Sequence, residues 1–443
     1  MSRPPQDDDD LLAPREGNRL RDTAAQATRA YVIHPELKSA NARRLPEHRL
    51  AEAVSLAAAL PELAVQGSDV VRLSRVTPAT LLGSGKVAEL KTLFHDLKID
   101  LVLIDGQVSP VQQRNLEKEW GVKLLDRTSL ILEIFADRAR TREGVLQVEL
   151  AALSYQRTRL VRAWTHLERQ RGGFGFVGGP GETQIESDRR AIDDQVVKLR
   201  RQLEQVVKTR ELHRAARAKV PFPIVALVGY TNAGKSTLFN RITGAEVLAK
   251  DMLFATLDPT MRGVTLPVGA KIILSDTVGF ISDLPTQLVA AFRATLEEVL
   301  SADLILHVRD ISHPETVEQA ADVTDILASL GVKEDTPIIE VWNKLDLVDA
   351  SQRGALTAQA AQRPMVLPVS ALTGEGVETL LSLIARTLDE DRTEETLTIP
   401  FDQGRKRAWL HDHNVVQVET EGEDGWHLTV RWTARQQTRW QRL

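Results

Sequence analysis

Short apolar runs alternate with helical patterns over residues 26–140 of this 443-residue chain. Four of the runs have the length and composition of buried strands: Tyr31–Ile33, Val70–Leu73, Leu101–Ile104 and Val122–Leu125. Apolar residues at helical spacing predict helices over residues 46–60, 86–98, 110–120 and 128–140, the last of which can continue into the next segment. Because strands and helices alternate, we expect a small α/β domain with a mostly parallel sheet.

Residues 141–222 follow a different pattern, in which apolar residues repeat at the three- and four-residue spacing of a helical seam. The first seam contains Leu146, Leu150, Leu153, Leu160, Trp164 and Leu167, with Arg157 at one seam position. The second contains Ile192, Val196, Leu199, Leu203 and Val206. The intervening RGGFGFVGGPGETQ has six glycines and a proline, which cannot continue a helix. We predict an antiparallel helical hairpin with a glycine-rich tip, whose second helix starts at a capping box of Thr183 and Glu186.

The hairpin is also where basic residues concentrate. Residues 155–219 contain 15 Lys and Arg against 8 Asp and Glu, although the whole chain has a formal net charge of −5. Phe174 and Phe176 lie among the glycines of the tip. Four arginines flank the tip: Arg169, Arg171, Arg189 and Arg190. Such a tip can enter a nucleic-acid crevice through stacking and phosphate contacts, or it can fold back on its own domain.

The rest of the chain divides into three further parts. Residues 1–25 are polar, include four consecutive aspartates and are expected to be a disordered acidic tail. Residues 223–388 form a second α/β domain, with strands expected at 223–228, 271–275, 304–308, 338–342 and 366–369. Residues 389–443 form a small C-terminal α+β domain with a predicted β-hairpin, Val415–Thr420 and Trp426–Trp432, whose tryptophans make a small core or a docking face.

The second α/β domain opens with a phosphate-binding motif. A buried strand, Ile224–Val228, runs into GYTNAGKST at residues 229–237 and then into a helix. Two glycines, a lysine and a serine at this spacing match the P-loop, whose backbone must curve closely around a polyanion at a helix N-terminus. Lys235 is expected to reach the β- and γ-phosphates, and the Ser236 hydroxyl to bind Mg²⁺.

Two later motifs indicate guanine rather than adenine. Asn343–Asp346 (NKLD) follow an expected strand, and the Asp346 carboxylate can accept hydrogen bonds from the ring N–H and the amine of guanine. Adenine would leave that carboxylate unpaired, which is costly. The Lys344 stem is expected to lie over the base, and Ser370–Leu372 (SAL) to supply a backbone N–H to the guanine carbonyl.

A switch region is expected between these motifs. In DTVG, Asp276 would hold Mg²⁺ through water, and the Gly279 N–H would bond the γ-phosphate, so that hydrolysis releases the following loop. In the upstream FATLDPT, Thr256 is predicted to complete the Mg²⁺ shell, with Thr260 as the alternative. Many GTPases have a glutamine after the DxxG glycine to orient the attacking water, but here that residue is Phe280. We therefore predict slow intrinsic turnover that a partner stimulates.

The predicted site combines these motifs. The catalytic residues are Lys235, Thr256 and Gly279, and the Mg²⁺ ligands are Ser236 and Thr256. The nucleotide-binding residues are Gly229, Tyr230, Thr231, Asn232, Ala233, Gly234, Lys235, Ser236, Thr237, Phe254, Ala255, Thr256, Leu257, Asp258, Asp276, Thr277, Val278, Gly279, Asn343, Lys344, Leu345, Asp346, Ser370, Ala371 and Leu372.

Composition and the weaker motifs narrow the class of protein. The chain has no cysteine, which excludes disulfides, thiol catalysis and cysteine-based zinc sites. Its first residues lack the apolar core of a signal peptide, and no apolar run approaches the ~20 residues of a membrane span. We expect a cytoplasmic, Mg²⁺-dependent GTP hydrolase that is a monomer. We interpret Gly83–Lys86 as a turn before a helix, His411 and His413 as solvated, and His307 as a core residue.

The motifs GYTNAGKST, FATLDPT, DTVGF, NKLD and SALTGEG, in this order, resemble those of the HflX family of GTPases, which is related to the Obg group. GGPGETQIESDRR after a helical hairpin resembles that family's own signature, and the preceding α/β domain matches its layout. The resemblance covers roughly residues 28–390. It implies a P-loop GTPase that binds the large ribosomal subunit in its GTP state, with its N-terminal part near rRNA of the peptidyl-transferase centre. It also implies stimulation by ribosomes and a role in splitting stalled ribosomes during stress.

Other functions remain possible from the residues alone. A large-subunit assembly factor would use the same ribosomal contacts. A signalling switch would bind protein partners, which the basic hairpin disfavours. A nucleotide-holding scaffold without turnover is disfavoured by the intact Lys235, Ser236 and Asp276.

Overall fold

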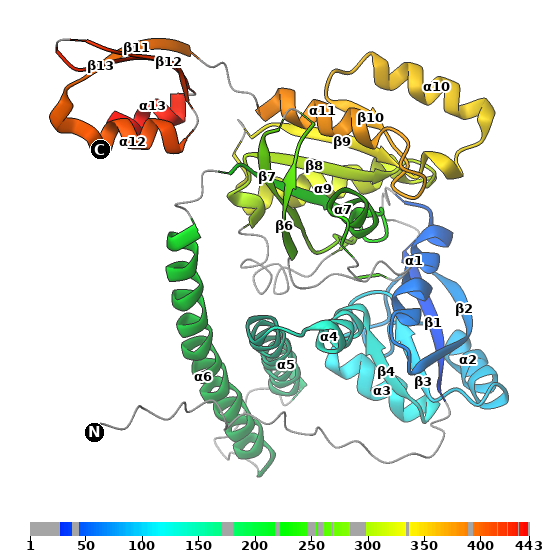
Figure 1. Cartoon of the computed structure of the whole chain (residues 1–443). Helices are drawn as coiled ribbons and strands as arrows, with labels where there is room; N and C mark the ends of the chain where they lie inside the picture. Colours follow the sequence, from blue (N-terminus) through cyan, green and yellow to red (C-terminus); the bar gives the residue numbers. More distant parts are fainter. Residues whose placement is uncertain are drawn as a thin grey trace, which may run out of the picture.

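The computed structural model is shown in Figure 1. It describes residues 27–37, 44–170, 180–217, 222–245, 253–254, 260–267, 269–283, 298–333, 336–388, 393–413, 415–422, 424–432 and 434–441. The predicted acidic tail, residues 171–179 of the glycine-rich tip and the residues Ala255–Asp258, including Thr256, lie outside the described residues.

A four-stranded parallel sheet in the order β2-β1-β3-β4 forms the N-terminal unit. Its strands are β1 (Thr28–Leu37), β2 (Leu63–Leu73), β3 (Leu101–Ile104) and β4 (Lys123–Asp126). Its helices are α1 (Pro46–Ala58), α2 (Ser84–Asp96), α3 (Pro110–Trp120) and α4 (Arg127–Arg138). The core residues of α1 and α4 cluster separately from those of α2 and α3, so helices cover both faces of the sheet. The predicted α/β unit is confirmed, with a sheet that is wholly parallel.

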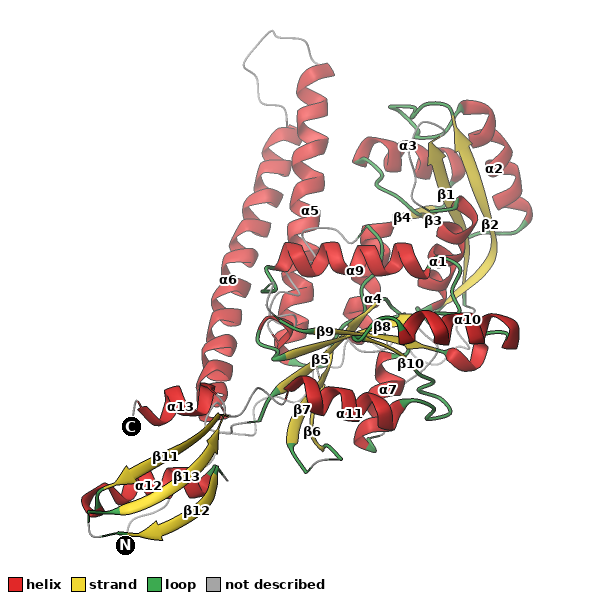
Figure 2. Cartoon of the chain, turned by 90° about the horizontal axis from the view of Figure 1, so that it is seen from above, coloured by secondary structure: helices red, strands yellow, loops and turns green. Residues whose placement is uncertain are grey.

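Two long helices follow, α5 (Arg142–Gln170) and α6 (Pro180–Arg217), and they lie side by side as a hairpin (Figure 2). The predicted start of α6 at a Thr183 capping box is wrong, because the helix already begins at Pro180. A proline suits a first helical position, where its missing N–H would have no partner in the helix. The polar seam residue Arg157 is explained by its ion pair with Asp193 of α6, with 2.8 Å between Nε and Oδ1.

A six-stranded sheet in the order β10-β9-β8-β5-β7-β6 organises the next unit. Its strands are β5 (Ile224–Gly229), β6 (Thr260–Thr265), β7 (Lys271–Asp276), β8 (Leu304–Asp310), β9 (Ile338–Asn343) and β10 (Val366–Pro368). Its helices are α7 (Lys235–Thr243), α9 (Thr316–Leu330), η1 (Leu345–Leu347), α10 (Ala350–Ala361) and α11 (Val377–Leu388). Core residues of α7 and α11 pack on one face, and those of α9 on the other.

The edge strand β6 is antiparallel to β7 and was not predicted from the sequence. Its sequence, TMRGVT, has one strongly buried residue, Val264, so it lacks the apolar run that marks the other strands of this sheet. Thr260, the alternative switch threonine, is its first residue and pairs with Asp276.

The C-terminal unit is an antiparallel sheet in the order β11-β13-β12 with two helices. Its elements are β11 (Thr393–Ile399), η2 (Phe401–Gln403), α12 (Gly404–Asp412), β12 (Val416–Glu421), β13 (Trp426–Trp432) and α13 (Ala434–Gln441). The predicted hairpin is confirmed as β12 and β13, whereas β11 was missed. Trp432 is fully buried in a hydrophobic cluster against which Trp409, Trp426 and Trp440 pack, so the tryptophans belong to a small core.

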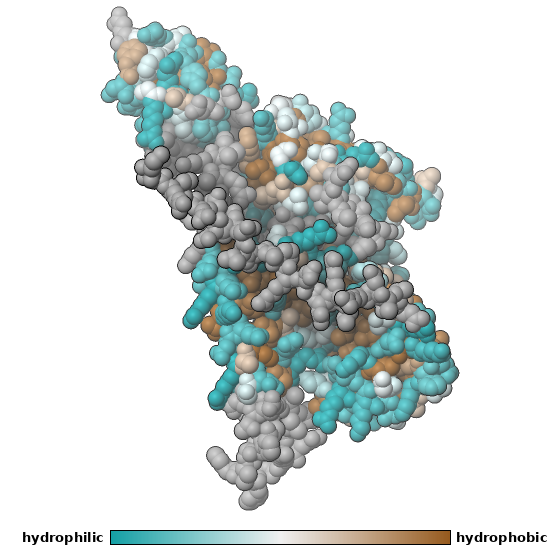
Figure 3. Space-filling model, turned by 60° about the horizontal axis from the view of Figure 1, so that its bottom comes forward, coloured by the Kyte–Doolittle hydropathy of each residue, from teal (hydrophilic) through white to brown (hydrophobic). Residues whose placement is uncertain are grey.

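One hydrophobic cluster joins the N-terminal unit to the six-stranded unit. It extends from Ala30 and Phe135 to Val228, Phe280 and Leu327. Within it, the Phe135 and Phe254 rings meet edge to face with 4.7 Å between their centroids. On the face in Figure 3, hydrophobic residues form separate patches among hydrophilic ones. Among the described residues, no helix is both long and apolar enough to cross a membrane.

Candidate nucleotide-binding site

The two P-loop glycines occupy positions that no other residue fits. Gly229 ends β5 with φ +153°, and a Cβ there would lie 2.2 Å from the Val308 carbonyl oxygen. Gly234 has φ +91°, and a Cβ there would lie 2.2 Å from Nδ2 of Asn343. The loop therefore passes tightly against β8 and the NKLD loop before α7 begins at Lys235.

Lys235 lies inside this loop with its ammonium group on backbone oxygens. Its Nζ donates to the carbonyl oxygens of Gly229 (3.2 Å) and Tyr230 (2.9 Å). Burial lowers the pKa of Lys235 to about 8, and the nearby Asp276 carboxylate only partly offsets that effect. A buried, poorly compensated cation is suited to bind an anion such as a phosphate.

The residues predicted to bind Mg²⁺ lie together where the structure describes them. The Ser236 Oγ donates to Oδ2 of Asp276 over 2.7 Å, which joins the start of α7 to the end of β7. A hydroxyl and a carboxylate are oxygen ligands of the kind that Mg²⁺ prefers, so this pair fits that ion directly or through water. A Cβ at Gly279 would lie 2.9 Å from the Thr231 Cα and 3.0 Å from the Lys235 Nζ, so the switch glycine packs directly on the P-loop.

The base-reading motifs are fixed to one another and to the P-loop through Asn343. Its Nδ2 donates to the Ala233 carbonyl oxygen (2.8 Å), and its Oδ1 accepts from the Ala371 N–H (2.9 Å). The Ser370 Oγ donates to Oδ1 of Asp346 over 2.5 Å, which orients that carboxylate. The three motifs, far apart in the sequence, therefore converge at the carboxyl ends of β5, β9 and β10, where ligands bind in open α/β sheets.

Several other predicted residues have structural partners. The Thr277 hydroxyl donates to the Leu227 carbonyl oxygen over 2.6 Å. Val278 and Leu345 are buried, and the Phe254 ring packs on Phe135 in the interdomain cluster. Leu372 is exposed. Only the backbones of these apolar residues are suited to a nucleotide.

Phe280, in place of the usual glutamine, is fastened to the P-loop by its backbone. Its N–H donates to the Gly229 carbonyl oxygen (3.1 Å), and its carbonyl accepts from the Thr231 N–H (2.7 Å). Its side chain is only 2% exposed and belongs to the interdomain cluster. The ring therefore points into the core.

The Tyr230 hydroxyl links the P-loop to the switch segment and to the N-terminal unit. It accepts from the Ser282 N–H over 2.7 Å and from Nη1 of Arg44 over 3.0 Å, and it donates to Glu52. Burial raises the pKa of Tyr230, and the Glu52 charge raises it further, so the hydroxyl keeps its proton.

Arg127, in the N-terminal unit, belongs to the same hydrogen-bond network as Tyr230, Glu52 and Ser282. Its guanidinium donates to Asp105 (2.5 Å), to Glu52, and to both the carbonyl oxygen and the hydroxyl of Ser282. Burial alone would raise the pKa of Glu52, but the Arg127 charge and hydrogen bonds from Tyr230 and Ser282 hold it below its ordinary value. Glu52 is thus a carboxylate, paired within the interface.

Sequence reasoning missed these interdomain partners and also Arg241. The Arg241 side chain, on α7, donates to the carbonyl oxygens of Ala371 (3.1 Å, from Nε) and Leu372, so it ties the P-loop helix to the base-reading loop. No short motif surrounds Arg241, and its partners lie 130 or more residues away. The sequence therefore held no signal that marks it.

The smaller candidates agree with the predictions only in part, because α2 already begins at Ser84, inside the predicted turn Gly83–Lys86. Lys86 forms ion pairs with Asp69 and Glu89 at the start of α2. The prediction that both histidines are solvated is wrong for His413, whose ring stacks on Trp409 with 3.8 Å between centroids, whereas His411 is half exposed and pairs with Glu419. Among the described residues, no group of three or more acidic or histidine side chains could hold a metal ion. Burial lowers the pKa of His307 to about 4, so it is a neutral core residue.

The parallel-rich sheet, the P-loop after its first strand and the NKLD and SAL loops define a P-loop guanine-nucleotide-binding protein. Four family models match in order: "GTP-binding GTPase N-terminal" at residues 47–136, "GTP-binding GTPase Middle Region" at 138–217, "50S ribosome-binding GTPase" at 224–344 and "HflX C-terminal domain" at 355–443. GTPase HflX of Magnetococcus marinus is 53% identical over 369 residues, which are 83% of this chain and 84% of the relative. GTPase HflX of Escherichia coli is 44% identical over 82% of this chain and 84% of its own length. The chain belongs to the HflX family of GTPases and is a GTP-hydrolysing P-loop enzyme.

A GTP-binding protein of the archaeon Sulfolobus solfataricus, in complex with GDP, is 24% identical, with a TM-score of 0.44. The match covers 81% of this chain and 98% of that one.

Proposed function

We propose that this GTPase binds the large ribosomal subunit through rRNA and uses its GTP cycle to dissociate stalled or idle ribosomes. The observation that carries the proposal is the match of residues 224–344 to the family described as 50S ribosome-binding GTPases, in a chain that belongs to the HflX family. The same partner supports a cytoplasmic location.

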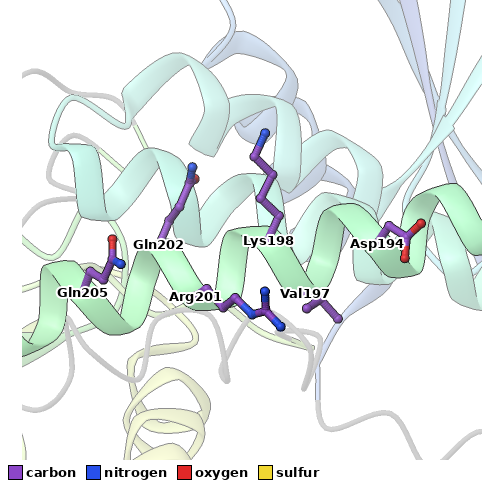
Figure 4. A pocket seen from close by; sticks show the side chains of 6 residues that line it. All are labelled: Asp194, Val197, Lys198, Arg201, Gln202 and Gln205. Atoms are coloured by element: carbon purple, nitrogen blue, oxygen red, sulfur yellow. The ribbon is translucent and has the colours of Figure 1, made fainter.

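The exposed side of α6 supports an RNA contact. Arg189, Lys198, Arg200 and Arg201 are exposed along the described part of this helix. Figure 4 shows a shallow hollow there, in which Lys198 and Gln202 point to one side and Val197 and Arg201 to the other. The hollow is also lined by Asp194 at one end, so its polar lining has two cations, two amides and one carboxylate. Cationic and amide side chains along a helix suit a phosphate backbone better than an apolar small molecule.

We assign a group of residues to each part of the nucleotide and to Mg²⁺. The P-loop backbone and Lys235 would hold the phosphates, Asp346 and the 370–372 loop would read guanine, and Ser236 would ligate Mg²⁺ with Asp276 behind it. Bound there, Mg²⁺ would neutralise charge on the phosphates. Thr256 would complete the Mg²⁺ shell from the segment before β6, and the Gly279 N–H would meet the γ-phosphate.

The position of Phe280 supports activation by a partner. Its ring is held in the interdomain core, and an apolar ring cannot orient water. The group that positions the attacking water would then come from the ribosome or from a rearrangement that the ribosome causes, as an activating partner does for other GTPases.

The proposal is tested by GTP hydrolysis with and without purified large ribosomal subunits, at 50 and 200 mM salt. We expect strong stimulation that weakens at the higher salt, because phosphate contacts release counterions. If GTP binds tightly and the subunits do not stimulate hydrolysis, the ribosome-activated proposal is wrong, and a protein activator becomes the better explanation.

A second measurement separates dissociation from subunit assembly. Intact ribosomes are mixed with the protein and GTP, or with GDP, and sedimented. Conversion to subunits with GTP but not with GDP supports dissociation. Stimulated hydrolysis without any conversion would favour an assembly factor.

A further inference from the structure

The Lys344 side chain is fastened at its charged end by a residue outside the guanine motifs. Asp310 is the last residue of β8 and pairs in register with Asn343, the last residue of β9. The Lys344 Nζ lies 2.8 Å from Oδ2 of Asp310, and the two side chains are 20% and 13% exposed. The ion pair therefore bridges the carboxyl ends of two neighbouring strands beside the base-reading loop.

Asp310 is oriented by hydrogen bonds within its own loop, in addition to its ion pair with Lys344. Its Oδ1 accepts hydrogen bonds from the Ser312 backbone N–H (3.1 Å) and from the Ser312 hydroxyl (2.6 Å). The Ile311 N–H donates to the Asn343 carbonyl oxygen over 3.0 Å, which joins the two strand ends. One carboxylate oxygen is thus fixed by its own loop, and the other is directed at Lys344.

Lys344 has an unusual backbone, which limits where its stem can go. Its φ of 63° and ψ of 34° place it in the left-handed region, which non-glycine residues seldom adopt. The backbone sets the direction of the side chain at one end, and Asp310 sets it at the other. A free lysine stem has four rotatable bonds, and a stem fixed at both ends loses little further freedom when a ligand packs on it.

We propose that Asp310 is a positioning residue for guanine recognition: it holds the Lys344 stem extended as the platform on which the base lies. The inference rests on the proposed role of Lys344 at the base. Because Asp310 acts on the base and not on the phosphates, its removal should weaken the binding of GTP, GDP and GMP by a similar factor. The chemical step, carried out at the γ-phosphate, is left unchanged.

The test compares Asp310→Ala, Asp310→Asn, Lys344→Ala and the double variant Asp310→Ala/Lys344→Ala in the full chain. Dissociation constants are measured with fluorescent GDP and by competition with GTP and GMP, and kcat and KM with GTP. The matched control is Asp349→Ala, which removes an exposed acid five residues after Lys344 with no side-chain cap bond.

For Asp310→Ala we expect all three dissociation constants to rise by a similar factor, on the order of 5- to 30-fold, with kcat within twofold of the native value at saturating GTP. The double variant should bind no more weakly than Lys344→Ala, because Asp310 acts through the lysine. Asp349→Ala should stay within twofold. Asp310→Asn keeps the shape and the acceptor for Ser312, so its loss of affinity separates the ion pair from a folding defect.

Three other outcomes would contradict the inference or the role of Lys344 on which it rests. If Lys344→Ala binds weakly but both Asp310 variants bind like Asp349→Ala, the positioning role is wrong while the role of Lys344 stands. If Lys344→Ala binds normally, the proposed base platform itself is wrong. If the losses of the two single variants add in the double variant, Asp310 acts independently of Lys344, which also overturns the inference.

Discussion

The Arg127 guanidinium, in the N-terminal unit, donates to both the carbonyl oxygen (3.0 Å) and the hydroxyl (3.2 Å) of Ser282, three residues beyond the switch glycine. The same side chain pairs with Asp105 and Glu52, and all of these groups are largely buried. One arginine therefore pairs with two buried carboxylates, which also contact Arg44 and His34, and binds the segment that follows the switch glycine.

Arg127→Ala should destabilise the protein strongly. Without the guanidinium, Glu52 would keep, among the ion pairs of the described residues, only that with Arg44, and Asp105 only its contact with His34. Removing one member of a buried ionic group costs about 3–5 kcal/mol. The free energy of unfolding is measured in urea. Arg72→Ala is the control, because its ion pair with Glu36 is largely exposed and is worth about 1 kcal/mol or less. A loss for Arg127→Ala no larger than that of the control would mean that the buried network does not form in solution.

Phe280→Gln should not restore fast intrinsic hydrolysis. The backbone of residue 280 is hydrogen-bonded to the P-loop, and its side chain is directed into the apolar cluster. A glutamine at this position would therefore not reach an attacking water. Burying its amide without partners should instead lower stability by about 1–3 kcal/mol. Single-turnover GTP hydrolysis without ribosomes checks the rate, and Phe280→Leu is the apolar control. A rate for the glutamine variant tenfold above native would show that this residue does face the γ-phosphate.

Nucleotide binding should take up protons near pH 8. The pKa of Lys235 is about 8 without nucleotide, so roughly half of the molecules have a neutral lysine at that pH, and phosphates would restore its charge. We expect an uptake of about half a proton per bound GDP at pH 8, and much less at pH 7. Calorimetry in two buffers of different ionisation enthalpy measures it. Equal heats in both buffers at pH 8 would show that the lysine is already fully charged.

His307 should contribute to acid instability. Its pKa is about 4 in the folded chain against 6.5 for an ordinary histidine, because it is buried and lies near Arg309 and Lys235. The folded pKa is lower than the unfolded one, so stability is lost as the pH falls from about 6.5 to 4, by up to about 3 kcal/mol. His307→Leu should flatten this part of the pH profile in urea unfolding. Parallel profiles for the two proteins would mean that other groups cause the loss.

The nucleotide motifs could be predicted because their physical requirements are local. Gly229 and Gly234 are needed where the backbone passes β8 and Asn343, and a lysine and a serine must follow at the start of a helix. Strands β5, β8 and β9 were equally readable, because their buried apolar runs follow one another at the spacing of an α/β fold.

The contacts between the units could not be predicted, because they depend on residues that only the tertiary fold brings together. The Tyr230 hydroxyl meets Arg44 and Glu52, which lie 186 and 178 residues away in the sequence. A tyrosine in a P-loop gives no indication of these partners. Strand β6 was missed because this edge strand has one buried residue, Val264, and so carries little hydrophobic pattern. The start of α6 was missed because a proline in a glycine-rich run can begin a helix as well as prevent one.

The order β2-β1-β3-β4 has a further consequence for the N-terminal unit. In parallel sheets of this kind, ligands bind beyond the carboxyl ends of the strands at the point where the strand order reverses, which here lies between β1 and β3. His34 of β1 and Asp105 after β3 meet at that point, and Arg127 carries the contact on to Ser282. The six-stranded sheet has its own reversal between β5 and β8, beside the P-loop. The reversal point of the six-stranded sheet thus lies beside the P-loop, whereas that of the four-stranded sheet holds the contact between His34 and Asp105, from which Arg127 reaches Ser282 of the switch segment.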